Sequence, residues 1–267
     1  AEQRKRVEEV CFRSLALIGR NCEYLEQHFD RTGADESTRQ AVADINTAAI
    51  QLERTLTEAI TLLEFLREDT KPQLYPLDLC ELLQQVAAQS DMIRAQLGVD
   101  IRLDYGGCTA CCVMADRRDA ELLCLHLLSN ALRASREGGS VCIALRRNES
   151  GWQLTVTDDG CGLPGQDAQA ALENRRSFLG GAQLGLLLCR ECCRRMDWSL
   201  QLKSAPAKGT QAVVNIPLYA GESRPDGTVE LRTDSETERE QRKYHLRAML
   251  VREMRTMPER GDPEEDF

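Results

Sequence analysis

Residues 121–165 are the most informative stretch of the sequence: they open with ELLCLHLLSNALRASREGG and close with VTDDGCGLPG, and GGAQLGL follows at residues 180–186. In the opening segment, His126, Asn130 and Arg133 recur at i, i+4 and i+7, which places them on one face of a predicted helix. The closing segment ends an alternating, β-rich run, WQLTVT, with an acid that two glycines follow. An amide, a base and an acid brought together beside glycine turns can hold a nucleotide and its metal ion.

Asp158 stands where the β-rich run ends, and Gly160 and Gly162 follow it without side chains that would block an approaching flat ring. A carboxylate accepts two hydrogen bonds, so Asp158 suits the exocyclic amine of adenine. An ordinary Asp-Gly turn is the alternative interpretation, because D-D-G-x-G is a common short motif.

Asn130 is polar within an otherwise apolar helical run, and a buried asparagine must find hydrogen-bond partners. Its amide oxygen is a suitable ligand for Mg²⁺, which also binds phosphates, although a helix-satisfied surface asparagine is the alternative. Arg133 can hold a phosphate, but a helix-surface arginine is more often solvated. Gly181 and Gly185 precede and begin a predicted helix whose positive end can face phosphates.

Composition restricts the classes of function. The chain has 267 residues, of which 42% are apolar, and a formal net charge of −9. This acidic balance argues against a nucleic-acid-binding surface, and no apolar run reaches the roughly 20 residues of a membrane-spanning helix. The 12 cysteines lie among long helical patterns, so we expect a reducing cytoplasm. The chain is then cytoplasmic throughout or the cytoplasmic part of a longer, membrane-anchored protein.

Two cysteine clusters, CTACC at residues 108–112 and CRECC at residues 189–193, contain CxxC pairs of the kind that bind zinc. The first falls in a predicted strand–turn–strand and the second on a predicted helix, and nothing in the sequence brings them together. We therefore expect packed cysteines rather than a four-thiolate zinc site.

Residues 1–70 are predicted to form a helical hairpin. RTGADEST supplies a glycine turn, and Asp35 or Ser37 can cap the second helix. Apolar residues recur three and four apart along the second helix, as in the stripe of a coiled coil, and a matching stripe runs along the first. Two helices alone bury little of these stripes, so we predict a homodimer through residues 1–70 that completes a four-helix bundle.

Residues 71–218 carry strands on both sides of helices without regular βαβ alternation, which predicts an α+β sandwich. We expect one long helix over residues 77–98 and a later one over residues 183–196. Residues 219–267 are charge-dense, and we expect a tail that is solvated, partly disordered or docked on a partner, with a short helix around residues 236–256.

From end to end, residues 71–218 resemble the ATP-binding domain of histidine kinases, the fold shared with type II topoisomerases and mismatch-repair ATPases. PLDLCELLQQV is similar to the opening segment of that domain, MADRRDAELLCLHLLSNALRAS to its asparagine box and KGTQAVVNIPL to its closing strand. TVTDDGCGLP and GGAQLGLLLCR are similar to its two glycine boxes. The resemblance implies a Bergerat-type α/β sandwich after a dimerisation-type hairpin, with ATP and Mg²⁺ as ligands. It also implies a response regulator or a partner kinase as the protein partner.

The resemblance assigns roles to individual residues. Asp158 would read adenine, Asn130 would bind Mg²⁺, and residues 163–182 would form a lid over the nucleotide. The nucleotide-binding residues that it implies are Asn130, Arg133, Asp158, Gly160, Gly162, Gly181, Gly185 and Thr210.

The chain departs from the family pattern in three places. His126 replaces the first asparagine of the asparagine box, and Gln183 stands where the middle glycine of the second glycine box is usual. The expected phosphoacceptor position on the first helix falls on Glu8 or Glu9, and His28 lies too close to the turn. Glutamate is no simple substitute for imidazole as a phosphoryl acceptor, so we do not expect self-phosphorylation at the usual site.

His126 lies one turn before Asn130, where related hydrolytic ATPases keep a glutamate base. One hypothesis makes His126 a catalytic group that orients or deprotonates a nucleophile near the γ-phosphate. The alternative is a packed helix histidine that fills the asparagine position.

Three functions stay open from the sequence. The first is a signalling kinase of the two-component class that transfers the γ-phosphoryl group of ATP to a histidine on a partner. The second is a degenerate kinase that acts as a nucleotide-gated protein-interaction module. The third is a serine kinase of the anti-sigma type, a class that normally lacks a long helical hairpin.

Overall fold

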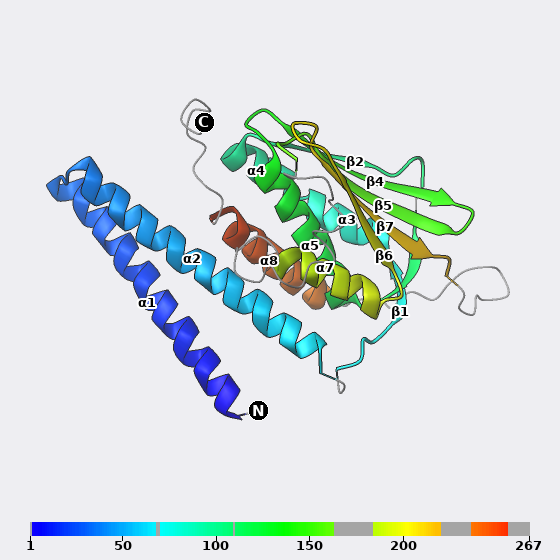
Figure 1. The fold of residues 1–267 in the computed structure, drawn as a ribbon, viewed down its shortest axis with the longest axis horizontal. Coiled ribbons are helices and arrows are strands. Elements are labelled where there is room, and N and C mark those ends of the chain that lie inside the picture. Colours follow the sequence, from blue (N-terminus) through cyan, green and yellow to red (C-terminus); the bar gives the residue numbers. More distant parts are fainter. Residues whose placement is uncertain (1, 68–69, 109, 163–183, 220–235, 256–267) are drawn as a thin grey trace.

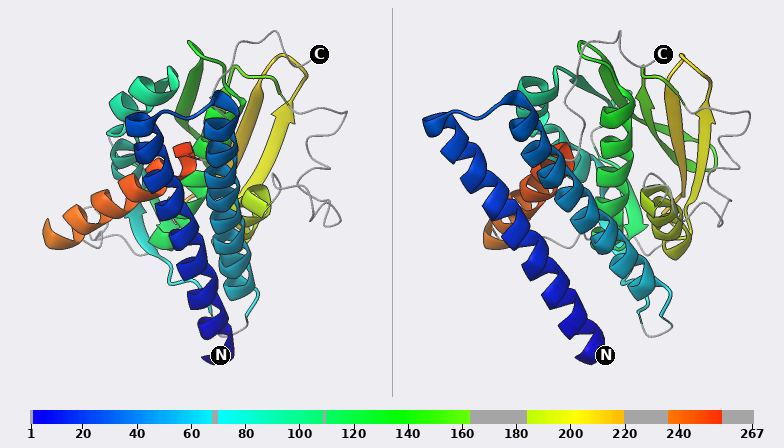
Figure 2. Two further views of the ribbon diagram at one scale, coloured as in Figure 1. Left: turned by 90° about the vertical axis from the view of Figure 1, so that its left-hand side faces the viewer. Right: turned by 60° about the vertical axis from the view of Figure 1, so that its left-hand side comes forward.

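The computed structural model describes residues 2–67, 70–108, 110–162, 184–219 and 236–255 (Figure 1). In the right-hand view of Figure 2, the sheet, a layer of helices and the N-terminal hairpin follow one another across the molecule. The predicted α+β class, a helical hairpin followed by an α/β sandwich, is confirmed.

The hairpin consists of α1 (Glu2–Thr32) and α2 (Glu36–Phe65), which lie antiparallel. The chain reverses at Gly33, whose φ of +75° lies in the left-handed region that favours glycine. Asp35 caps α2, because its carboxylate accepts a hydrogen bond from the backbone N–H of Thr38 at 2.7 Å.

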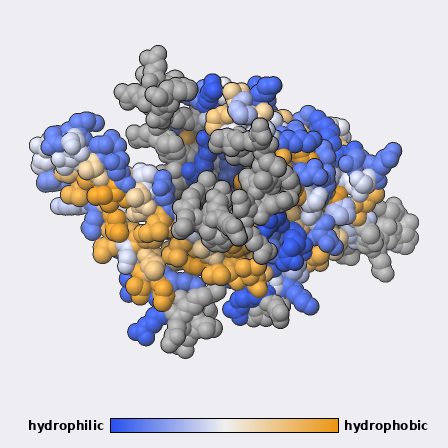
Figure 3. Space-filling view, in the orientation of Figure 1, coloured by the Kyte–Doolittle hydropathy of each residue, from blue (hydrophilic) through white to orange (hydrophobic). Residues whose placement is uncertain are grey.

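The apolar stripes of the hairpin are only partly covered by the two helices. Small or central members are buried within the hairpin, namely Leu15, Cys22, Val42 and Ala49. Large apolar side chains nevertheless stay more than half exposed, among them Val10, Leu17, Ile45, Leu52 and Leu63. Figure 3 shows hydrophobic surface gathered over the hairpin.

The main sheet has five strands in the order β2 (Asp100–Asp104), β4 (Ser140–Asn148), β5 (Gly151–Asp158), β7 (Thr210–Pro217) and β6 (Ser199–Ser204). The pair β2–β4 is parallel, and the other neighbours are antiparallel. Every second side chain is buried over residues 141–145 of β4 and 152–158 of β5, which is the pattern that the alternation in the sequence predicts.

Four helices cover one face of this sheet: α3 (Leu79–Ala87), α4 (Ser90–Leu97), α5 (Arg117–Ala134) and α7 (Leu184–Arg195). The core between the two layers consists of side chains that are almost completely buried, including Leu123, Leu128, Leu132, Leu145, Leu154 and Ile216.

The single helix predicted over residues 77–98 is wrong. Its first residues belong to β1 (Tyr75–Asp78), which pairs antiparallel with β3 (Cys112–Ala115). The Asp78 side chain then accepts a hydrogen bond from the backbone N–H of Cys80 and starts α3, and the helical run breaks again before α4. Strand pairing with a segment about 35 residues away overrides the local helical pattern here.

Arg195, at the end of α7, ties the hairpin to the helical layer. Its guanidinium lies 4.3 Å from the ring centroid of Phe65 and donates to the Thr70 carbonyl at 2.6 Å. It also bonds the buried carboxylate of Asp119 at 2.7 Å. One side chain thus holds the end of α2, the segment that follows it and the start of α5 together.

The C-terminal helix α8 (Glu236–Arg255) packs against α2 and α5 (Figures 1 and 2). Leu246, Leu250 and Met254 recur one turn apart and are buried in the same core cluster as the helical layer. Met249 and Val251 are partly buried and also pack against this cluster. No helix within the described ranges is long and apolar enough to cross a bilayer.

We expect Leu250→Ala to lower the free energy of unfolding by about 2–4 kcal/mol, because the side chain is completely buried. Tyr244→Ala, on the exposed side of the same helix, is the matched control and should change it by less than about 0.5 kcal/mol. Urea denaturation measures both variants. Equal effects would show that α8 does not pack as described.

Candidate functional site

A cavity of about 330 Å³ lies between α5, the start of α7 and the sheet, where β5 ends and β7 begins. Residues that the sequence pointed to gather on its wall: Asn130, Arg133, Asp158, Gly162 and Thr210. The remaining wall is largely apolar and consists of Leu127, Ala131, Ala134, Val156, Cys161, Leu186, Leu202 and Ala212. A mostly apolar pocket with a few convergent polar groups is the usual form of a small-molecule site.

Asp158 is the anchor of this wall and is only 6% exposed. Its Oδ1 accepts hydrogen bonds from the backbone N–H groups of Gly160 at 3.0 Å and Thr210 at 3.1 Å. Burial is the main influence and raises the pKa of the Asp158 carboxyl, while the two backbone hydrogen bonds act in the opposite direction. The carboxylate is therefore held in one orientation at the edge of the cavity.

The glycines around Asp158 are required by close backbone approaches. A Cβ on Gly162, whose φ is +69°, would lie 2.2 Å from the carbonyl oxygen of Ala205. A Cβ on Gly160 would lie 1.9 Å from the carbonyl oxygen of Ala134 at the end of α5. Gly160 thus packs the end of β5 onto α5 and is not among the residues that line the cavity.

Asn130 has a buried amide nitrogen that finds no hydrogen-bond partner among the described residues. The two ends of an amide are interchanged by a half-turn of the side chain, so this position can equally present an oxygen to a ligand. A buried polar atom without a protein partner fits a site that a ligand or a hydrated cation completes. Arg133, one turn further along α5, is half-buried on the same wall.

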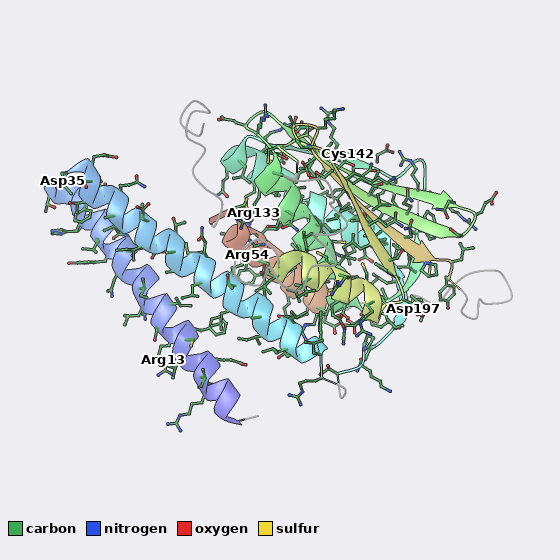
Figure 4. All side chains as sticks on the ribbon, in the orientation of Figure 1. Arg13, Asp35, Arg54, Arg133, Cys142 and Asp197 are labelled. Carbon is green, nitrogen blue, oxygen red and sulfur yellow. The ribbon has the colours of Figure 1, made fainter. Side chains whose placement is uncertain are left out.

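His126 and Gly185 face the hairpin instead of this cavity. His126 Nδ1 lies 3.7 Å from Glu58 Oε1 of α2, and Glu58 is paired with Arg54 at 2.9 Å. A Cβ on Gly185 would lie 3.4 Å from His126 Nδ1 and 3.6 Å from Glu58 Oε1. In Figure 4, Arg54 points from α2 toward the α/β domain. Although His126 and Asn130 are one turn apart, only Asn130 lines the cavity.

Sequence reasoning missed the contribution of the hairpin to this region. Arg54 and Glu58 stand between the apolar positions of α2, where charged residues are typical of a solvent-exposed surface. It also missed Gly209, whose added Cβ would lie 2.0 Å from the Asp158 carbonyl oxygen, although its place in the KGT sequence was a signal. Gly181, Gln183 and the expected lid over residues 163–182 lie outside the described residues.

The two cysteine clusters lie where the sequence predicted them. Cys111 and Cys112 lie before and at the start of β3, and Cys189, Cys192 and Cys193 lie on α7. Within the described ranges, no group of three or more His, Cys, Asp or Glu side chains is arranged to hold a metal ion. Burial raises the pKa of the Cys189 and Cys192 thiols, as expected for packed core cysteines.

Asp158→Asn tests the burial of this carboxylate in the absence of any ligand. Burial raises the pKa of Asp158 above its ordinary 3.8, so the folded state binds the proton more tightly than the unfolded chain does. The unaltered protein therefore loses stability as pH rises from 3.8 through the folded pKa, and the uncharged amide does not. We expect the free energy of unfolding of the variant, relative to the unaltered protein, to increase across that window and then level off. A difference that falls as pH rises, in urea titrations at several pH values, would contradict this.

Comparison with known proteins agrees with the geometry. Residues 115–220 match the family described as "Histidine kinase-, DNA gyrase B-, and HSP90-like ATPase". The alginate biosynthesis sensor protein KinB of Pseudomonas aeruginosa is 29% identical over 181 residues, which cover 65% of this chain and 30% of KinB. The adaptive-response sensory kinase SasA of Synechococcus sp. (strain CC9311) is 28% identical over 126 residues, which cover 45% of this chain and 33% of SasA. The chain spans about a third of the length of these relatives.

Solved structures share the fold over a larger part of the chain. Full-length ShkA in complex with AMPPNP has a TM-score of 0.58 at 18% identity and covers 82% of this chain and 47% of its own. Histidine kinase ThkA in complex with the response regulator protein TrrA has a TM-score of 0.57 at 18% identity and covers 82% of this chain and 62% of its own. Residues 115–220 form a domain of the histidine kinase-, DNA gyrase B- and HSP90-like ATPase family, and the chain is a histidine-kinase-like protein.

Proposed function

We propose that the chain binds ATP with Mg²⁺ in the cavity between α5, α7 and the sheet. The observation that carries this proposal is the convergence of Asp158, Asn130 and Arg133, from two separate elements, on one cavity of about 330 Å³. The match to an ATPase family supports it. So does the likeness to ShkA, which was solved with AMPPNP.

Each polar residue of the wall has a distinct role in this proposal. The Asp158 carboxylate, fixed by its backbone hydrogen bonds, accepts a hydrogen bond from the exocyclic amine of adenine, and the adenine ring packs against the apolar wall. Asn130 presents its amide oxygen to Mg²⁺, and Arg133 presents its guanidinium to phosphate oxygens. When bound, Mg²⁺ supplies positive charge that offsets the charge of the phosphates.

The described part of α1 carries no histidine before His28, so it offers no imidazole that could accept a phosphoryl group at the usual position. His28 lies near the hairpin turn and stacks on Tyr24, with 6.3 Å between ring centroids. We therefore assign the acceptor imidazole to a partner protein. ThkA, a protein of similar fold, was solved with a response regulator, and a regulator or a partner kinase is the corresponding partner here.

The same missing histidine favours a second candidate, a nucleotide-gated interaction module without phosphoryl transfer. Incubation with γ-labelled ATP separates the two candidates. Label on a histidine of an added regulator or kinase supports transfer, and nucleotide binding without label supports the module. Label on serine would support the anti-sigma type of kinase instead.

The partner of the hairpin, in this proposal, is a second copy of the chain. The exposed large apolar residues repeat along both helices, so the same surface on two copies can complete a four-helix bundle.

All twelve cysteines are free, which fits the reducing cytoplasm that we propose as the location of the protein.

Isothermal titration with ADP and Mg²⁺ tests the nucleotide site. We expect Asp158→Asn to weaken binding by about 10- to 100-fold, because the NH2 group of asparagine would face the exocyclic amine of adenine and both groups are hydrogen-bond donors. Asp159→Asn is the matched control, since Asp159 is exposed and bonds the Ser140 backbone N–H at 2.9 Å. Equal losses in both variants, or no binding by the unaltered chain, would refute the assignment.

Sedimentation equilibrium tests the second copy. We expect a dimer for the unaltered chain and a monomer for Leu52→Glu, which puts a charge on the exposed stripe of α2. Leu218→Glu, at a 42% exposed leucine beyond the end of β7, is the control and should remain dimeric. A dimer that survives Leu52→Glu would place the contact elsewhere.

A further inference from the structure

We infer that Glu58 of α2 is a specificity-determining residue for the nucleotide, although it lies in the hairpin and outside the ATPase-family domain. The docked hairpin places this carboxylate beside the start of α7. Its negative charge lowers the affinity for a nucleotide more strongly as the number of phosphates on the nucleotide increases. Arg54, one turn earlier on α2, acts in the opposite direction. This inference rests on the proposed function and adds to it a source of selectivity among ATP, ADP and adenosine.

The geometry begins with a buried charged cluster at the contact between α2 and the helical layer. Glu58 is only 4% exposed, and its Oε1 lies 2.9 Å from Arg54 Nε and 3.7 Å from His126 Nδ1. A Cβ on Gly185 would lie 3.6 Å from the same carboxylate oxygen and 3.7 Å from Arg54 Nη2. The hairpin therefore presents an acid and a base to the first turn of α7.

The cavity lies on the other side of that same turn. Leu186 lines the cavity together with Asn130 and Arg133, whereas Gly185, one residue earlier, faces the hairpin. The first backbone N–H groups of a helix carry partial positive charge and attract anions within about one turn. Glu58 and a phosphate bound in the cavity would act on the same helix end from opposite sides.

The side chains of Glu58 and His126 are buried, so the influence of the cluster is electrostatic and does not require direct contact with the ligand. The space beside Glu58 measures about 30 Å³ and is walled by Thr57, Thr61, Leu125 and Met249 as well as the charged residues. Such a volume holds no more than one or two waters and excludes a phosphate group. Charges at partly buried sites interact across several ångströms much more strongly than charges in bulk water.

Isothermal titration of the full chain with adenosine, ADP and ATP, each with Mg²⁺, tests the inference. We expect Glu58→Gln to raise the affinity for ATP about tenfold, the affinity for ADP less, and the affinity for adenosine by less than about twofold. Arg54→Gln removes the positive charge that offsets the Glu58 carboxylate. It should lower the affinity for ATP most, the affinity for ADP less and the affinity for adenosine least. Salt should reduce both effects only slightly, because buried charges are screened much less than exposed ones.

Glu64→Gln is the matched control. Glu64 lies on the same helix and at the same interface, but it pairs with Arg118 of α5 at 3.3 Å, away from the start of α7. It should leave the ratio of ATP to adenosine affinity unchanged. A shift in this ratio as large as that of Glu58→Gln would overturn the inference, because loosening of the hairpin would then explain the result.

The double variant Arg54→Gln/Glu58→Gln removes both charges and leaves no unpaired buried charge, so it guards against misfolding of the single variants. It should fold, as thermal unfolding will show, and return the ratio of ATP to adenosine affinity to within about twofold of the unaltered value. Unaltered protein that binds neither ATP nor ADP would overturn the proposed function. Unaltered protein that binds ATP, with a ratio that neither single variant changes, would overturn only the role of Glu58.

Discussion

One buried carboxylate organises the centre of this structure. Asp158 bonds the backbone N–H groups of Gly160 and Thr210 through the same oxygen, and so joins the end of β5 to the start of β7. Around it the backbone passes so closely that Gly160 and Gly209 leave no room for a Cβ. An unpaired carboxylate would be unstable at this depth, so its hydrogen bonds and the tight backbone around it depend on one another. The cavity has its shape because this joint is fixed.

The helical layer serves two surfaces at once. α5 and α7 present Asn130, Arg133 and Leu186 to the cavity, and His126 and Gly185 to the hairpin. Since a helix is only about 10 Å across with its side chains, groups on its two sides remain within electrostatic reach of each other. Arg195 and the two buried leucines of α8, Leu246 and Leu250, hold the hairpin and the helical layer in one packed core.

Much of the fold follows from local pattern. Alternation along β4 and β5, a cap at Asp35 or Ser37 and the helix that contains Gly185 each depend on a few neighbouring residues, so the sequence predicts them. The pairing of β1 with β3 joins segments about 35 residues apart, and it turned part of a predicted helix into a strand. Three of the apolar side chains of α8 find their partners more than a hundred residues away, which no local period reveals.

The candidate site divides in the same way. Residues at the ends of elements, such as Asp158, Asn130 and Thr210, lie together because the topology of the sheet brings those ends to one edge. Helical spacing alone was a poorer guide, since it put His126 and Asn130 on one face while the structure gives them different neighbours. Residues at i and i+4 lie on the same side of α5, but the hairpin contacts one part of that side and the cavity borders another part.

Two sides of α2 make different contacts in a chain whose α1 carries no histidine before His28. One side of α2 carries the exposed apolar stripe, and the other side carries Glu58, Leu62 and Phe65, which are buried against the α/β domain. A helix that merely joined two parts of a chain would need neither surface. Both surfaces bury or present apolar area, which stabilises contacts without requiring any reacting group. Neither surface of α2 depends on an acceptor histidine on α1, and under the proposed function the imidazole that accepts the phosphoryl group comes from the partner.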